Sequence, residues 1–477
     1  MGLKQRIING IGWNVGGSII TQAFGFITKI ILARILFPED FGLFAMVIIV
    51  IQFLNLFVGS GLSSAVIYKK EDPHKTLSTA FILALSTGFI LSLISFLSGS
   101  HVAKFFNEPA LNPMIKLISI VLIFDSISTI LYAGLVKELH FKRKAVVDVV
   151  AIIIYSTSVL VLALLGYGAW SLIIAYIIQH TIQAIVLWII SPIKPNIYFD
   201  KEIAKEIGHF GKYSVATLIF SWAITSIDNI LVGKKLGDEG LGYYSFGFNI
   251  ATLPVLSITH MITGVFHPVF AKVRDNKEKL QEAYLKPLEW SLIFILPMSA
   301  GLFILAEPLV KVIFGERWLS MIPILKIFSL YSIFRTVCTI IAQLLEGVGK
   351  PKTAGKIVGI ELLIIVILIV PSITYYGILG VAWIIIIARI ISMCLYLLEI
   401  KKVVSVTYKD YTEILGKKIV ATIIMGVCVY SLKLLLKTTL LDLFIITVSG
   451  MILYGLLILW LEKRIYKEFY NFLNYNT

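Results

Sequence analysis

Charged side chains lie inside long apolar stretches of this sequence, and they are the residues best placed to do chemistry. Arg335 and Arg389 fall near the middle of such stretches, and a guanidinium group cannot lose its charge to suit an apolar environment. A charge at the centre of a bilayer costs about 2.5–3.5 kcal/mol or more, so such a side chain faces protein or water. Each arginine could form a structural ion pair with Asp125 or Glu361. Alternatively, both could line a cationic cavity for a negatively charged substrate, because guanidinium groups match the geometry of phosphate oxygens.

A second group of polar residues could bind or move ions. Asp228 could form a cation site or pair with Lys29, although a lysine away from mid-span can also extend its amine to the membrane interface. His180 and His260 could carry protons, because histidine changes charge near neutral pH. The alternative for each histidine is an ordinary hydrogen-bonded contact between helices. The candidates for ion coupling are Asp228, Glu361, His180 and His260.

The composition excludes a soluble enzyme. Hydrophobic residues make up 58% of the chain and charged residues 15%, and the mean hydropathy is +0.92. Soluble domains have about 45–50% apolar and about 25% charged residues. The net charge of +14 is typical of lysines and arginines in cytoplasmic loops, so we expect no nucleic-acid partner. Cys338, Cys394 and Cys428 lack the spacing of metal ligands, and we expect neither a metal nor a cofactor.

About 14 apolar stretches are long enough to cross a bilayer as helices, since a span needs about 20 apolar residues. They lie near residues 10–34, 41–66, 77–98, 113–136, 146–166, 169–191, 213–233, 241–265, 286–310, 321–345, 355–375, 378–399, 416–436 and 440–461. Lysines and arginines are roughly three times as frequent on one side of this arrangement as on the other, which places both termini in the cytoplasm. The sequence therefore predicts an all-α, polytopic membrane protein.

An internal repeat with an offset of 200 residues organises these helices. Residues 27–44 and 227–244 align without gaps, with identical glutamates at 39 and 239 and identical glycines at 42 and 242. The two copies start six spans apart, so they have the same orientation. Two six-helix lobes related by an axis along the membrane normal would enclose a shared cavity, and the last two helices fall outside the repeat. We expect lobes at 1–192 and 213–400, a cytoplasmic connector at 193–212, and two further helices with a cytoplasmic tail at 401–477.

Polar residues recur on one face of the repeated helices. Close packing through small residues would explain the serines and glycines among them. Gln52, Asn55 and Asn249 have longer polar groups that need water or a partner. We therefore expect these three side chains to line the cavity.

Two segments resemble one family of bacterial exporters. Residues 12–47, GWNVGGSIITQAFGFITKIILARILFPEDFGLFAMV, are similar to the first two spans of Wzx-type polysaccharide exporters, in the branch of WzxC and the teichuronic-acid exporters. Residues 226–250, SIDNILVGKKLGDEGLGYYSFGFNI, are similar to the seventh and eighth spans of that family. The resemblance implies the multidrug/oligosaccharidyl-lipid/polysaccharide flippase superfamily, whose members form two V-shaped lobes. It also implies that Lys29, Arg34 and Asp228 are cavity residues, whereas it does not place the two mid-span arginines.

The function implied by this resemblance is transport rather than catalysis. Members move oligosaccharides linked to undecaprenyl pyrophosphate across the bacterial cytoplasmic membrane for export of O-antigen, capsule, exopolysaccharide or teichuronic acid. Membrane lipids are then partners, and a polysaccharide polymerase and chain-length proteins are further candidates. Two alternatives stay open: a multidrug/cation antiporter of the same superfamily, and a membrane polysaccharide polymerase or ligase. The absence of a catalytic motif in the sequence favours a protein that is not an enzyme.

Overall fold

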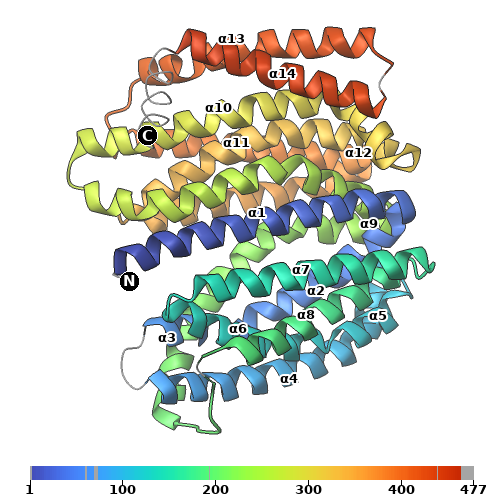
Figure 1. The fold of residues 1–477 in the computed structure, drawn as a ribbon, viewed down its shortest axis with the longest axis vertical. Coiled ribbons are helices and arrows are strands. Elements are labelled where there is room, and N and C mark those ends of the chain that lie inside the picture. The colour runs from blue at the N-terminus through green and yellow to red at the C-terminus, as the bar shows by residue number, and fades with distance from the viewer. Residues whose placement is uncertain (1–2, 60–61, 69–72, 193, 438, 463–477) are drawn as a thin grey trace. The chain divides into compact units, whose positions relative to one another are not determined.

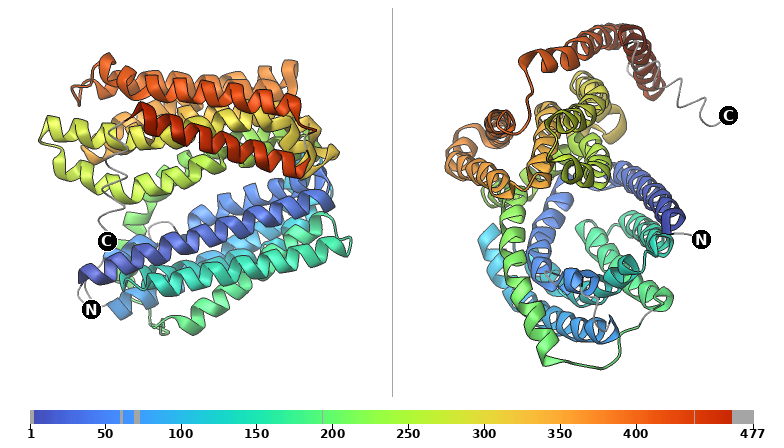
Figure 2. Two further views of the ribbon diagram at one scale, coloured as in Figure 1. Left: turned by 45° about the horizontal axis from the view of Figure 1, so that its top comes forward. Right: turned by 90° about the vertical axis from the view of Figure 1, so that its left-hand side faces the viewer.

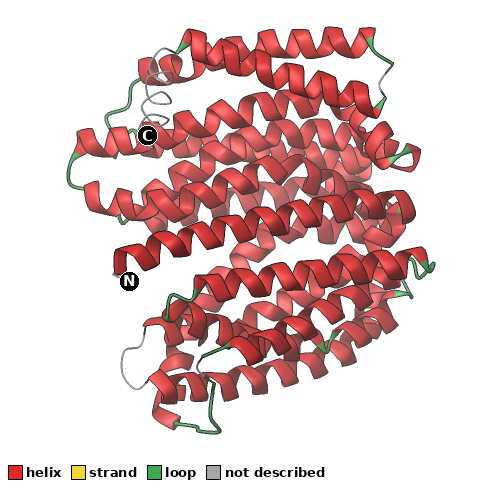
Figure 3. Cartoon of the chain, in the orientation of Figure 1, coloured by secondary structure: helices red, strands yellow, loops and turns green. Residues whose placement is uncertain are grey.

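The computed structural model describes residues 3–59, 62–68, 73–192, 194–437 and 439–462, and helices form almost all of them (Figure 3). No strand occurs in these ranges. Eleven of the described helices are long and apolar enough to cross a membrane. The predicted all-α, polytopic architecture is therefore confirmed.

The chain divides into two compact units, residues 1–242 and 243–477. The described helices of the first unit are α1 (Leu3–Ile35), α2 (Pro38–Gly59), α3 (Leu62–Tyr68), α4 (Pro73–Phe106), α5 (Leu111–Ile118), α6 (Val121–Lys137), α7 (Phe141–Leu164), α8 (Ala169–Ile190) and the first part of α9 (Lys201–Val273) (Figure 1). α7 packs on both α1 and α8, while α6 contacts α4 and α8. Leu32, Val159 and Leu172 belong to the core shared by α1, α7 and α8. The lobe limits at 192 and 213 stay a prediction.

The second unit contains the rest of α9 and the remaining helices. These are α10 (Lys277–Leu309), a π-helical turn (Val310–Phe314), a 3₁₀ turn (Glu316–Met321), α11 (Ile322–Gly347), α12 (Pro351–Ile400), α13 (Tyr408–Leu435) and α14 (Leu440–Leu461). α11 packs between α10 and α12, and α13 and α14 run side by side (Figure 2). Capping boxes formed by Thr407 with Asp410 and by Thr439 with Asp442 start α13 and α14, because each pair satisfies backbone amides that have no helical partner.

Two glycines divide long helices into pairs. Gly237 interrupts α9 with φ 72°, and Gly377 interrupts α12 with φ 57°. Only glycine adopts such a conformation readily. The predicted stretches 213–233 and 241–265 lie on either side of the first break, and 355–375 and 378–399 on either side of the second. Each of the other predicted stretches also falls on helix, although 41–66 is divided between α2 and α3, and 113–136 between α5 and α6.

The outer surfaces of both units are apolar. Leu164 on α7 is 73% exposed, Leu435 on α13 is 79% exposed and Trp460 on α14 is 74% exposed. Soluble proteins rarely expose so much contiguous apolar surface. These faces therefore contact lipid.

The offset of 200 residues recurs in the packing of the first unit. A Cβ atom at Gly42 would overlap the backbone carbonyl of Asp238, and one at Gly242 would overlap the carbonyl of Pro38. Pro38 and Asp238 are themselves 200 residues apart, so the contact is reciprocal. The two glycines that the repeat conserves are thus the residues that let two backbones touch.

A second correspondence, with an offset of 210 residues, relates α6 to α11. Residues 123–130 of α6 read IFDSISTI, and residues 333–340 of α11 read IFRTVCTI. The turns that follow these helices place a residue with positive φ at 139 and at 349. Asp125 in the first unit is therefore equivalent to Arg335 in the second.

The next helix continues this correspondence. Gly168 before α8 has φ 52°, and Gly377 in the middle of α12 has φ 57°. Both glycines follow a tyrosine. Counting from these two turns, His180 of α8 is equivalent to Arg389 of α12.

Candidate transport site

Arg389 forms a buried ion pair in the second unit. Its Nη2 atom lies 2.8 Å from Oε1 of Glu361, and the Glu361 side chain is only 2% exposed. The same nitrogen donates to the hydroxyl of Tyr331 at 3.1 Å, and the guanidinium carbon lies 5.4 Å from the centre of the Tyr331 ring. The structural ion pair considered for this arginine is therefore correct. Its charge is neutralised by Glu361 rather than free for a substrate.

Arg335 differs from Arg389 in having no such neighbour. It lies on α11 in a partly buried position, and its guanidinium has neither a hydrogen bond nor an ion pair within the described part of the chain. The predicted alternative of a pair with Glu361 is thus wrong for Arg335, whereas a pair with Asp125, which belongs to the other unit, stays a prediction. Because the side chain keeps its positive charge, it needs water or an incoming anion beside it.

Asp125 is the centre of a polar cluster in the first unit. Its Oδ1 atom contacts ring nitrogen Nδ1 of His180, and its Oδ2 atom accepts a 2.6 Å hydrogen bond from the Asn55 amide. The side chains of Asp125 and His180 are 13% and 16% exposed. The Tyr176 ring packs against the imidazole, with ring centres 4.2 Å apart. The sequence singled out Asn55 and His180 separately, whereas the structure joins them through Asp125.

A second polar cluster of the first unit shares α6 and α8 with the Asp125 cluster. The hydroxyl of Tyr132 donates to Oδ1 of Asp148 at 2.6 Å, and Lys144 donates to Oδ2 of the same carboxylate at 2.7 Å. Gln183 of α8 donates to the Tyr132 oxygen at 2.8 Å. This network joins α6, α7 and α8.

The other predicted cavity residues of the first unit do not converge on one point. Lys29 is partly buried and has no hydrogen-bond or ion-pair partner among the residues described, so the suggested pair with Asp228 is not formed. Asp228 is 4% exposed and accepts hydrogen bonds from the backbone and side-chain amides of Asn229. Arg34 and Gln52 are exposed.

Two further predicted residues, besides Arg335, Glu361 and Arg389, belong to the second unit. Asn249 is exposed and donates to the carbonyl of Ser245 at 2.7 Å, one helical turn away. The side chain of His260 lies outside the described residues.

The sequence did not indicate that Lys418 is buried. Lys418 of α13 is 0% exposed, and its amine lies 2.7 Å from Glu462 and 3.4 Å from Glu289. It also donates to the carbonyl of Ile414 at 2.9 Å. These contacts tie α13 to α10 and to the end of α14. Lys418 lies near the start of the predicted stretch 416–436, and no local pattern in the sequence indicated its burial.

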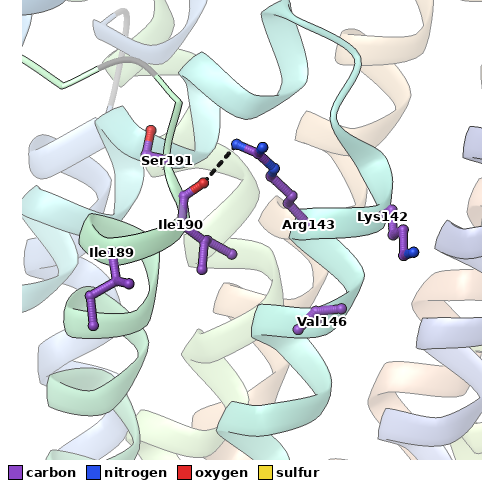
Figure 4. Close-up of a pocket in the computed structure, with 6 residues that line it drawn as sticks. All are labelled: Lys142, Arg143, Val146, Ile189, Ile190 and Ser191. Carbon is purple, nitrogen blue, oxygen red and sulfur yellow. Dashed lines mark hydrogen bonds between the residues drawn. The ribbon is translucent and has the colours of Figure 1, made fainter.

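A basic hollow opens between the ends of α7 and α8 (Figure 4). Its volume is about 590 Å³, and it is lined by Lys142, Arg143, Val146, Ile189, Ile190 and Ser191. Arg143 donates to the carbonyl of Ile190 at 2.8 Å and so caps the last turn of α8. Lys142 extends elsewhere, 5.1 Å from the Trp13 ring centre. None of the predicted transport residues lines this hollow.

Comparison with known proteins identifies a family. Residues 31–323 match the family described as polysaccharide biosynthesis protein. Over 440 residues the chain is 25% identical to the lipopolysaccharide biosynthesis protein WzxC of Escherichia coli (strain K12), a match that covers 92% of this chain and 89% of WzxC. Over 388 residues it is 24% identical to the teichuronic acid biosynthesis protein TuaB of Bacillus subtilis (strain 168), covering 80% of each.

The fold has a counterpart among solved structures. The lipid II flippase MurJ in an inward closed conformation matches with a TM-score of 0.79 and 18% identity, over 94% of this chain and 98% of that one. The family match spans more than half of the chain, and the resemblance seen in two sequence segments is confirmed. This chain therefore belongs to the polysaccharide biosynthesis protein family, as a Wzx-type member of the multidrug/oligosaccharidyl-lipid/polysaccharide flippase superfamily.

Proposed function

We propose that this protein is a flippase that moves oligosaccharides linked to undecaprenyl pyrophosphate across the bacterial cytoplasmic membrane. The observation that carries the proposal is the partly buried guanidinium of Arg335, which has no partner in the described structure. A permanent cation inside a membrane protein is stabilised when an anion reaches it. The pyrophosphate that joins sugar to lipid is such an anion, and its oxygens suit a guanidinium fork.

Transport by alternating access gives this cation its role. Sugars and pyrophosphate cannot cross hydrocarbon unaided, because burying their polar groups without partners is unfavourable. The headgroup passes along a polar path while the polyprenyl tail stays in lipid, and the helices then rock to open the path outward. Arg335 holds the pyrophosphate. Lys29, Arg34 and Gln52 of the first unit and Asn249 of the second unit stay candidates for contact with the headgroup.

The two arginines have different tasks in this proposal. Arg389 is already neutralised by Glu361, so it supports the helices around Arg335 rather than binding substrate. Glu361 is for the same reason a structural partner and not an ion-coupling group. Asp228 stays a candidate cation site, because its carboxylate is buried on the polar face of α9.

The membrane supplies direction and energy. Both termini lie in the cytoplasm, as the distribution of lysines and arginines predicts. Moving one charge through 100 mV is worth about 2.3 kcal/mol, so the membrane potential can contribute to transport. A polysaccharide polymerase and chain-length proteins then receive the flipped units.

The test replaces each arginine in a strain whose own gene is deleted. The Arg335→Ala variant should reduce surface polysaccharide at least tenfold at a normal protein level, and lipid-linked repeat units should accumulate on the inner leaflet. The matched control is the double variant Glu361→Gln/Arg389→Met, which removes the other guanidinium without leaving a buried charge. It should retain export. Unchanged surface polysaccharide in the deletion strain, or normal export by Arg335→Ala, would contradict the proposal.

A further inference from the structure

Asp125, His180 and Asn55 form a polar cluster near the middle of the membrane spans, where charged residues are rare. Asp125 is near the middle of the span Leu111–Lys137, and His180 is at the middle of the span Ala169–Ile190. Both side chains are mostly buried, and Asn55 reaches them from a third helix. Ionisable residues inside membrane spans mark ion pathways or proton relays more often than they serve packing.

The contact between the two side chains leaves one nitrogen for proton exchange. Nδ1 of His180 faces the carboxylate of Asp125, so Nε2 is the nitrogen that can gain or lose a proton. With a neutral imidazole the pair carries one negative charge, and with a proton on Nε2 its net charge is zero. Because the pair is partly buried, the carboxylate attracts the imidazolium more strongly than it would in water. The pair therefore has two possible charge states, which differ by one proton at Nε2.

Among the described residues of α2, α4, α6, α7 and α8, no other carboxylate or amine lies at mid-span, whereas Lys29 lies within the span of α1, which shares a core with α7 and α8. Tyr176 of α8 and Tyr155 of α7 are the ionisable side chains nearby, and neither is charged near neutral pH. The Asp148 carboxylate of α7 is occupied by Lys144 and Tyr132. α3 carries no charged residue, and those of α2, α4 and α5 lie outside mid-span, at Glu39, Asp40, His74, Lys75, His101, Lys104 and Lys116.

The second unit has permanent cations at the equivalent positions. Asp125 corresponds to Arg335 and His180 to Arg389, by the offsets of about 210 residues described above. Arginine keeps its charge at any pH in a protein, whereas the aspartate–histidine pair does not. The two copies of one structural position therefore differ in the property that matters for proton binding.

We propose that the Asp125–His180 pair is a proton-binding site of the first unit, which exchanges one proton at Nε2 of His180 during transport. The inference that this proton is used for transport rests on the flippase function proposed above. The proton site itself is a property of the first unit and stands without it.

Nitrogen-15 NMR of the full-length protein, with isotope-labelled histidine, tests whether His180 binds a proton. The chain has seven histidines, and the variant His180→Gln identifies the signal of His180. This signal should show both the neutral and the protonated imidazole as the proton concentration is varied, and Asp125→Asn should change the balance between the two forms. Asp148→Asn is the matched control and should leave the titration unchanged. A His180 signal that does not titrate, or that Asp125→Asn does not shift, would overturn the proposal.

The use of the proton is tested by export in cells treated with nigericin, which collapses the pH gradient. Wild-type export should fall, whereas the residual export of His180→Gln and of Asp125→Asn should not respond. Export by His180→Gln that still falls with nigericin would contradict a coupling role. If deletion of the gene leaves surface polysaccharide unchanged, the flippase proposal fails, but the NMR titration still decides the proton site.

Discussion

Replacing Glu361 should show how much the stability of the second unit depends on the neutralisation of Arg389. The Glu361 carboxylate is 2% exposed and lies 2.8 Å from the guanidinium. After Glu361→Gln, the guanidinium keeps its hydrogen bond to Tyr331 but loses its only ion pair among the described residues. Breaking a buried pair by removing one partner costs about 3–5 kcal/mol, because it leaves a buried charge uncompensated.

The expected loss lies near the lower end of this range. In detergent or lipid the unfolded chain also finds partners for its polar groups, which reduces the measured difference. We therefore expect Glu361→Gln to lower the free energy of unfolding by about 3 kcal/mol. That is roughly a hundredfold change in the unfolding equilibrium. Adding Arg389→Met removes the stranded charge and should restore stability to within about 1 kcal/mol of the wild type.

Reversible unfolding of the purified protein in mixed micelles measures both values. The matched control is Glu399→Gln at the end of the same helix, where the carboxylate pairs with the largely exposed Lys402 at 2.6 Å. Exposed pairs contribute about 0.2–1 kcal/mol, so this variant should change little. A loss for Glu361→Gln no larger than that for Glu399→Gln would refute the argument that a buried pair holds Arg389. A double variant Glu361→Gln/Arg389→Met that is less stable than Glu361→Gln alone would also refute this argument.

Three further predictions concern packing and topology. Replacing Gly42 or Gly242 by leucine should abolish folding or export, because the side chain would occupy the position of a backbone carbonyl; normal protein levels and export in both would show that the helices do not approach so closely. Replacing Lys418 by methionine should destabilise the attachment of α13 and α14 by about 3–5 kcal/mol, since two carboxylates lose their common cation; proteolysis of the hairpin at the wild-type rate would contradict this. Single cysteines at Gly166 and Lys350 should react with impermeant thiol reagents from outside and from inside respectively, and the reverse pattern would invert the proposed topology.

The helices could be predicted because bilayer thickness dictates the length of an apolar run. Each predicted stretch falls on helix, and the breaks at Gly237 and Gly377 lie between predicted stretches. The repeat was also visible, since Gly42 and Gly242 permit a close backbone contact that no other residue allows.

Glu361 was among the partners considered for Arg389, but the other partners of the buried charged residues could not be predicted, because they come from distant parts of the chain. Asp125 and His180 are 55 residues apart, and Lys418 and Glu289 are 129 apart. Apolar periodicity indicates which face of a helix is buried but not which helix covers it. The match between IFDSISTI and IFRTVCTI was a usable signal, and it would have shown that Asp125 and Arg335 occupy equivalent positions in the two units.

Translocation by the purified protein tests the central claim most directly. The full-length chain is reconstituted in liposomes with a fluorescent undecaprenyl-pyrophosphate-linked monosaccharide, and the fraction of probe that reaches the opposite leaflet is measured with a membrane-impermeant quencher. The wild type should move the probe well above the rate in empty liposomes, Arg335→Ala should fall to that background, and Glu361→Gln/Arg389→Met should stay active. Equal rates for the wild type and Arg335→Ala would contradict a free guanidinium as the site that holds the pyrophosphate.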